Sequence, residues 1–200
     1  TYSRGAWLSL FIVLFAIGIL ARRGRYLLLG LVSLVAIVVL SEPSVAERVN
    51  SIFHPHLESS SALRIAIWDS TSYIIRDHWF NGIGWGAFPA VYPAYDYFLG
   101  TNQTIIYHAH NLFLQLLAEV GVVGFLIWMT IALSVLWRLW KKINQHNAMA
   151  LGLCAALGVV LFCGLTDDLL YNPQIMTFFW FLIGLAQINE RNTSEIEGIE

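Results

Sequence analysis

Apolar stretches separated by short polar connectors make up most of the chain. Residues 6–21 and 26–40 are almost entirely apolar, and flanking residues bring each to the roughly 20 residues that a membrane-spanning helix needs. Three more apolar stretches, residues 112–137, 148–165 and 175–188, follow a longer mixed segment. The pattern predicts an all-α integral membrane protein with about five transmembrane helices.

Two basic connectors predict the orientation of these helices. Arg22-Arg23-Gly24-Arg25 joins the first two apolar stretches, and Arg138, Lys141 and Lys142 end the third. Cytoplasmic connectors carry an excess of Lys and Arg, so both connectors are expected in the cytoplasm. Five crossings then leave residue 1 outside and the polar tail, residues 189–200, inside.

The mixed segment between the second and third spans is predicted to be a large outer-face loop. A helix is expected from Ser61 to His78, with Leu63, Ile67 and Ile74 on its apolar side and nearby serines as N-cap. The glycine-rich residues 81–86 should end it in tight turns. The expected organisation is residues 1–41 with two transmembrane helices, 42–110 as the extracytoplasmic loop with its amphipathic helix, 111–188 with three transmembrane helices, and 189–200 as the cytoplasmic tail.

Composition agrees with a membrane protein and narrows the possible partners. Apolar residues form 58% of the chain and charged residues 12%, with mean hydropathy +0.65. A net charge of −2 argues against a nucleic-acid partner. The chain begins with Thr and shows no signal-peptide pattern, so we expect a C-terminal portion of a longer protein. Cys154 and Cys163 point to nearly opposite sides of one apolar stretch and predict no disulfide.

The polar groups at the predicted outer face are mainly arginines and histidines. Without a phosphate-binding loop they argue against nucleotide use and suit an anionic substrate such as a lipid-linked diphosphate. Arg4 and Arg64 are candidates for gripping phosphate oxygens. Their alternatives are an interfacial anchor for Arg4 and a solvated helix face for Arg64. Arg76 is expected to pair with Asp77, Asp69 or solvent.

His110 is the candidate general base. It precedes Asn111, Gln115 and Glu119, which are spaced i, i+4, i+8 and form one polar stripe on the expected helix. The alternative is an ordinary interfacial histidine. Glu119 in an apolar helix is a functional candidate, and we favour a supporting role that orients a neighbour. Gly121 and Gly124 fit small-residue helix packing.

A metal site is considered and not predicted. His108 and His110 form a His-x-His pair that can bind metal, but the sequence offers no Cys or nearby carboxylate set to complete it. Asp167-Asp168 could be an acid–base pair, although an exposed outer turn accounts for it more simply. No cofactor is expected.

Several motifs in order resemble the O-antigen ligase family, which includes Wzy-type O-antigen polymerases and protein-glycosylating oligosaccharyltransferases. The resemblance covers roughly residues 1–137 and rests on Ser3-Arg4-Gly5-Ala6, Arg64-Ile65-Ala66-Ile67-Trp68, Gly82-Ile83-Gly84-Trp85-Gly86-Ala87-Phe88, His110-Asn111-Leu112-Phe113-Leu114 and Glu119-Val120-Gly121-Val122-Val123-Gly124.

The resemblance implies a multi-pass enzyme of the bacterial inner membrane whose active site faces the periplasm. Such enzymes move a glycan from a polyprenyl (undecaprenyl) diphosphate carrier to a hydroxyl of a lipid or polysaccharide acceptor, without nucleotide and, in the ligases, without metal. By motif, His110 would be the general base and Arg4 and Arg64 would bind diphosphate, with Asn111 and Glu119 in support. Two alternatives stay open, namely a transporter (a bicarbonate-transport-like relative) and a catalytically silent protein that binds lipid-linked glycan.

Overall fold

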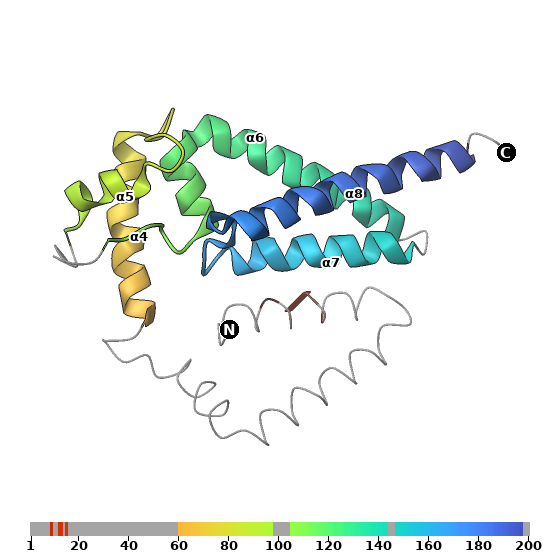
Figure 1. Cartoon of the computed structure of the whole chain (residues 1–200), viewed down its shortest axis with the longest axis horizontal. Coiled ribbons are helices and arrows are strands. Elements are labelled where there is room, and N and C mark those ends of the chain that lie inside the picture. The colour runs from red at the N-terminus through yellow and green to blue at the C-terminus, as the bar shows by residue number, and fades with distance from the viewer. Residues whose placement is uncertain are drawn as a thin grey trace, which may run out of the picture. The chain divides into compact units, whose positions relative to one another are not determined.

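The computed structural model describes residues 60–97, 105–143 and 147–197, together with Ser9, Ile12, Val13 and Phe15 (Figure 1). Within these residues every regular element is a helix and none is a strand, in agreement with the predicted all-α class. The predicted first two spans, apart from those four helical positions, and Arg4 lie outside the described residues. The chain divides into two compact units, Thr1–Leu63 and Arg64–Glu200, and the second carries the features that follow.

Three helices of the second unit pack on one another: α6 (Leu112–Ile143), α7 (Ala148–Cys163) and α8 (Pro173–Glu197). They correspond to the third, fourth and fifth predicted spans. Their shared core is formed by buried apolar side chains, because each helix turns an apolar face toward the other two. α8 continues past Ile188, the expected end of the fifth span, to Glu197. The largest of its fully buried side chains are those of Leu112, Leu139, Leu157 and Phe179.

The bundle presents apolar side chains outward as well as inward. Among the described helices, α6 is long and apolar enough to cross a membrane, while α7 and residues Pro173–Ile188 are shorter apolar helices. Leu126, Ile127 and Trp137 of α6 and Phe181 of α8 are more than half exposed. Such a surface is unfavourable in water and suits hydrocarbon. The five-crossing topology stays a prediction.

α6 is kinked at Gly121, where φ is +65° and ψ is −174°. Only glycine adopts this backbone conformation readily. The backbone groups freed at the kink pair with the turn that follows α4. Ile83 N–H donates to Ala118 O (2.9 Å), Gly84 N–H to Glu119 O (2.9 Å), and Val122 N–H to Trp79 O (2.8 Å). Gly121 therefore permits a close backbone approach, and its expected role in helix–helix packing is wrong.

The loop helix α4 (Ser60–Asp77) agrees closely with the predicted Ser61–His78 helix. Ile67 and Ile74 are fully buried, as expected, but Leu63 is 41% exposed. The reason is that its apolar cluster begins at Ile67, and Leu63 lies one turn before it. The cluster also takes side chains from α5 (Phe88–Val91) and the 3₁₀ helix η1 (Tyr92–Tyr95), and the start of α6 completes it.

Candidate active site

The start of α6 is hydrogen-bonded to the turn that follows α7. Asn111 caps α6, because its Oδ1 accepts the backbone N–H groups of Phe113 (3.0 Å) and Leu114 (3.1 Å). Its Nδ2 donates to Leu165 O (3.0 Å), and Leu112 N–H donates to Gly164 O (2.8 Å). These bonds hold His110, which precedes the capping residue Asn111, against the residues after Leu165.

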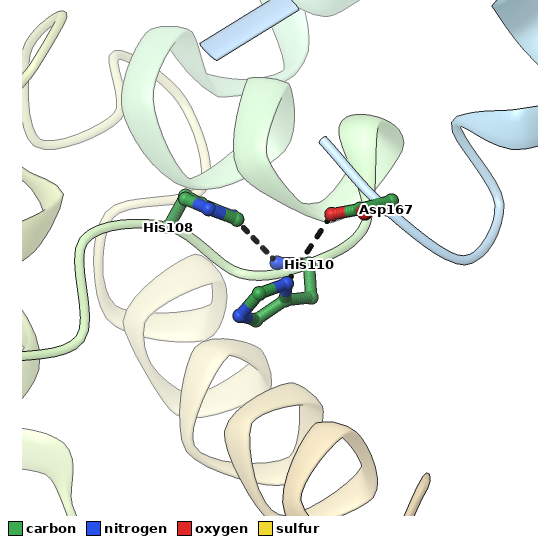
Figure 2. A group of neighbouring side chains, drawn as sticks. All are labelled: His108, His110 and Asp167. Carbon is green, nitrogen blue, oxygen red and sulfur yellow. Dashed lines mark hydrogen bonds and ion pairs between the residues drawn. The ribbon is translucent and has the colours of Figure 1, made fainter. Parts of the chain in front are cut away.

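These hydrogen bonds bring together a histidine–aspartate dyad. His110 Nδ1 lies 3.2 Å from Asp167 Oδ1 in a hydrogen bond, although the two residues are 57 positions apart (Figure 2). A carboxylate only accepts, so the bond places the imidazole proton on Nδ1 and leaves Nε2 as the accepting nitrogen. His110 also has a φ of +50°, a conformation uncommon for residues other than glycine. Both side chains are about one-third exposed.

His108 lies beside the dyad. Its ring centroid is 4.2 Å from that of His110 and 4.8 Å from that of Tyr171, and its Nδ1 accepts the backbone N–H of His110 at 3.3 Å. Burial, helped by nearby His110 and Arg64, lowers the pKa of His108 from 6.5 to about 4. The side chain is therefore neutral at physiological pH. His108 is not predicted from the sequence to take part in the mechanism.

Arg64 lies on α4, which is tied to the histidine segment because Trp68 Nε1 donates to Ala109 O at 2.9 Å. Its positive charge contributes to the lowered pKa of both His108 and Asp167. For Asp167 the larger cause is the hydrogen bond from His110, and the lowered pKa keeps the carboxylate ionised. Arg64 thus belongs to the electrostatic surroundings of the dyad. The predicted pairing of Arg76 with Asp77 is confirmed at 3.6 Å.

The predicted polar stripe binds backbone groups of neighbouring segments. Besides the cap formed by Asn111, Gln115 Oε1 accepts Ala109 N–H at 2.8 Å and Glu119 Oε1 accepts Phe88 N–H at 3.4 Å. Gln115 and Glu119 are each 5% exposed. One side of α6 therefore anchors both the segment before the helix and the turn before α5.

Asp168 is 7% exposed and accepts Tyr171 N–H at 3.3 Å, capping the 3₁₀ helix η2 (Leu169–Tyr171). Burial, opposed by its backbone hydrogen bonds, raises the pKa of Asp168 from 3.8 to about 6. The residue contributes to the lining of a cavity of about 180 Å³. Its polar lining is Gln115, Glu119 and Asp168, and its other residues include Trp85 and Tyr171.

Replacing Asp168 with asparagine should remove one pH dependence of stability. The wild-type carboxyl is protonated up to about pH 6 in the folded protein but only to about 3.8 when unfolded, so its contribution to stability falls as the pH rises between these values. An asparagine at this position would keep the cap without the charge. We expect Asp168→Asn to gain relative stability across this window, by up to about 3 kcal/mol.

Thermal unfolding midpoints of both proteins in detergent, measured from pH 4 to pH 8, test this expectation. The contribution of His108 to stability has the opposite pH dependence, because its lowered pKa reduces stability as the pH falls from 6.5 toward 4. Its contribution is common to both proteins and cancels in the difference between the two curves. Parallel curves across the whole range would contradict the raised pKa of Asp168.

From the sequence, Asp167 and Asp168 are considered as an acid–base pair, but an exposed turn is preferred. The interpretation of Asp167 and Asp168 as an exposed turn is wrong, because one bonds His110 and the other is buried. The statement that no carboxylate completes a metal set with the His-x-His pair is also wrong. One potential ligand atom from each of His108, His110 and Asp167 lies within 4.8 Å of the others. The available signal was an acidic pair directly after an apolar stretch. Cys154 and Cys163 are not joined in a disulfide, as predicted.

The described helices therefore form an all-helical bundle with one helix apolar enough to cross a membrane and a potential acid–base site at the start of that helix. The family model described as O-antigen ligase matches residues 1–129. The chain therefore belongs to the O-antigen ligase family, which confirms the resemblance found in the sequence. This family is membrane-embedded and transfers glycans. A comparison with curated protein sequences gives no match.

Proposed function

We propose that this protein transfers a glycan from a polyprenyl diphosphate carrier to an acceptor hydroxyl at the periplasmic face of the bacterial inner membrane. The observation that carries the proposal is the His110–Asp167 hydrogen bond at the start of α6, in a chain of the O-antigen ligase family. An imidazole held by a carboxylate is a general-base arrangement found on unrelated folds. The acceptor belongs to a lipid or a polysaccharide.

His110 would activate the acceptor. Its Nε2 takes the proton of the acceptor hydroxyl while that oxygen bonds to the anomeric carbon of the carrier-linked sugar. Asp167, kept ionised by its lowered pKa, stabilises the positive imidazolium formed in this step. The bond between the anomeric carbon and the diphosphate oxygen breaks with its electron pair leaving on the diphosphate, and the imidazolium later releases its proton to water.

Arg64 would neutralise the departing diphosphate. Guanidinium groups match phosphate oxygens in a bidentate fashion, and fixed positive charge is most effective where water is scarce. Support comes from the electrostatic influence of Arg64 on His108 and Asp167. Arg4, assigned by motif, would share this role. In this mechanism side chains alone bind the diphosphate of the carrier and deprotonate the hydroxyl of the acceptor, with neither nucleotide nor metal.

A transporter and a silent glycan-binding protein are the alternatives. A transporter needs polar groups through the depth of the bundle, whereas the groups described above gather where α6 begins and α7 ends. A silent binder needs no oriented base. Purified full-length protein should transfer glycan in EDTA when given a polyprenyl diphosphate glycan and an acceptor. Carrier-independent ion flux in vesicles, or carrier binding without transfer, would overturn the proposal in favour of one alternative or the other.

Replacing Asp167 with asparagine should lower kcat at least about tenfold, because the imidazolium loses its stabilising charge. KM for carrier and acceptor should change little, since Asp167 is proposed to act through His110 and not on substrate. Steady-state transfer kinetics measure both constants. Asp69→Asn, at an exposed position of α4, is the matched control and should leave both unchanged. An unchanged kcat in Asp167→Asn would contradict the proposed dyad.

A further inference from the structure

We propose that His108, His110 and Asp167 also bind a divalent transition-metal ion such as Zn²⁺, and that this binding inhibits transfer. Two imidazoles and a carboxylate form a common donor set for zinc. The three side chains are partly buried, and one potential ligand atom from each lies within 4.8 Å of the others (Figure 2). The inhibitory effect rests on the function proposed above, whereas the binding does not.

The spacing of the dyad suits a tetrahedral ion. With metal–ligand bonds of about 2.0–2.1 Å, adjacent ligand atoms of a tetrahedral site lie about 3.3 Å apart. His110 Nδ1 and Asp167 Oδ1 are separated by 3.2 Å. An ion lying to one side of the line between these two atoms can therefore bind both of them at nearly their present separation.

His108 would supply the third ligand. Its ring lies next to that of His110, with centroids 4.2 Å apart. The bond that holds its Nδ1 is long, at 3.3 Å from His110 N, so reorienting this ring gives up little. The donor set then leaves a fourth coordination position for water. Asn111 and the bonds from α6 to residues 164 and 165 hold two of the three ligands in place before any ion arrives.

Metal binding would remove the base. In the metal-free dyad Nδ1 carries the proton and Nε2 accepts. When an ion coordinates Nδ1, the single proton of the neutral ring lies on Nε2, which then has no lone pair for the acceptor hydroxyl. Asp167 is likewise occupied by the ion. The same side chains thus give an active metal-free state and an inactive metal-bound state.

Binding is tested by titrating Co²⁺ into the full chain in detergent and following the ligand-field absorption of four-coordinate cobalt, with Zn²⁺ as competitor. His54→Ala/His56→Ala is the background, because this His-Pro-His pair can itself take metal. His108→Ala should weaken binding by more than the roughly 10–100-fold that loss of an outer-shell partner costs. Asp167→Asn should weaken it similarly, and His78→Ala, at an exposed position, should not.

Inhibition is tested by measuring, for each variant, the transfer rate in Zn²⁺ divided by the transfer rate of the same variant in EDTA. Zn²⁺ should lower this ratio in the background protein, and His108→Ala should restore it, which separates binding at the site from chelation of the diphosphate carrier. Absence of cobalt binding in the background protein, or equal binding in His108→Ala and His78→Ala, would overturn the inference. Transfer in EDTA would still support the proposed function in that case. Metal binding without any glycan transfer would overturn both the inhibition and the proposed function, but not the metal site itself.

Discussion

Replacing His110 with asparagine should reduce glycan transfer by about 10²–10⁴-fold, the usual contribution of a positioned general base. Asparagine is the informative substitution because His110 has a φ of +50°, and asparagine tolerates positive φ better than alanine does. The backbone that leads into α6 should therefore keep its conformation. The loss should lie in kcat, measured with a polyprenyl diphosphate glycan, an acceptor and EDTA.

His78→Asn is the matched control for this measurement. His78 is exposed just after α4, where its backbone N–H donates to Ile74 O, and an asparagine there keeps that bond. We expect unchanged transfer and an unchanged unfolding midpoint. Should His110→Asn transfer at the wild-type rate while remaining folded, the assignment of the base would be wrong.

Replacing Gly121 with alanine should destabilise the protein by at least about 3 kcal/mol. A Cβ at Gly121 would lie 2.2 Å from Phe80 O and 2.7 Å from Gly82 N, both backbone atoms that cannot turn aside. The residue also has a φ of +65°, which disfavours any side chain. A Cβ at Gly82 would come equally close to the backbone oxygen of Glu119, so Gly82→Ala should be comparably harmful.

Thermal unfolding in detergent, with size-exclusion profiles, measures this effect. Gly152→Ala is the control, because that glycine lies inside α7 and a Cβ there would meet nothing within 4 Å. Alanine favours helix over glycine by about 1 kcal/mol, so the control should be neutral or slightly stabilising. If Gly121→Ala unfolds at the wild-type midpoint, the close approach of the two glycines would be refuted.

Local features of the sequence were enough to predict α4 and the start of α6. The repeat of apolar positions places α4 within a residue of its observed ends, and the His110-Asn111 dipeptide marks the start of α6. Each of these signals acts over one or two helical turns, and so does the polar stripe of α6. Periodicity and capping depend on neighbours in sequence, which a single chain displays in full.

The features that the sequence did not reveal depend on contacts between distant segments. Asp167 reaches His110 only because Asn111 and Leu112 bond the turn after α7, and nothing local distinguishes it from an exposed acidic residue. From the sequence alone Gly121 looks like a small residue for helix packing. Its true role cannot be seen there, because its partner, Gly82, lies in another segment. Leu63 has the correct helical phase, yet its packing cluster ends one turn away.

The bonds between α6 and the turn after α4 also bear on how the protein is made. Residues 79–84 leave the ribosome before residues 118–122, so the amides of Ile83 and Gly84 and the carbonyl of Trp79 have no final partner when they are synthesised. Those partners exist only once the kinked helix has formed. The turn after α4 therefore reaches its final conformation only after α6, a later helix, has formed.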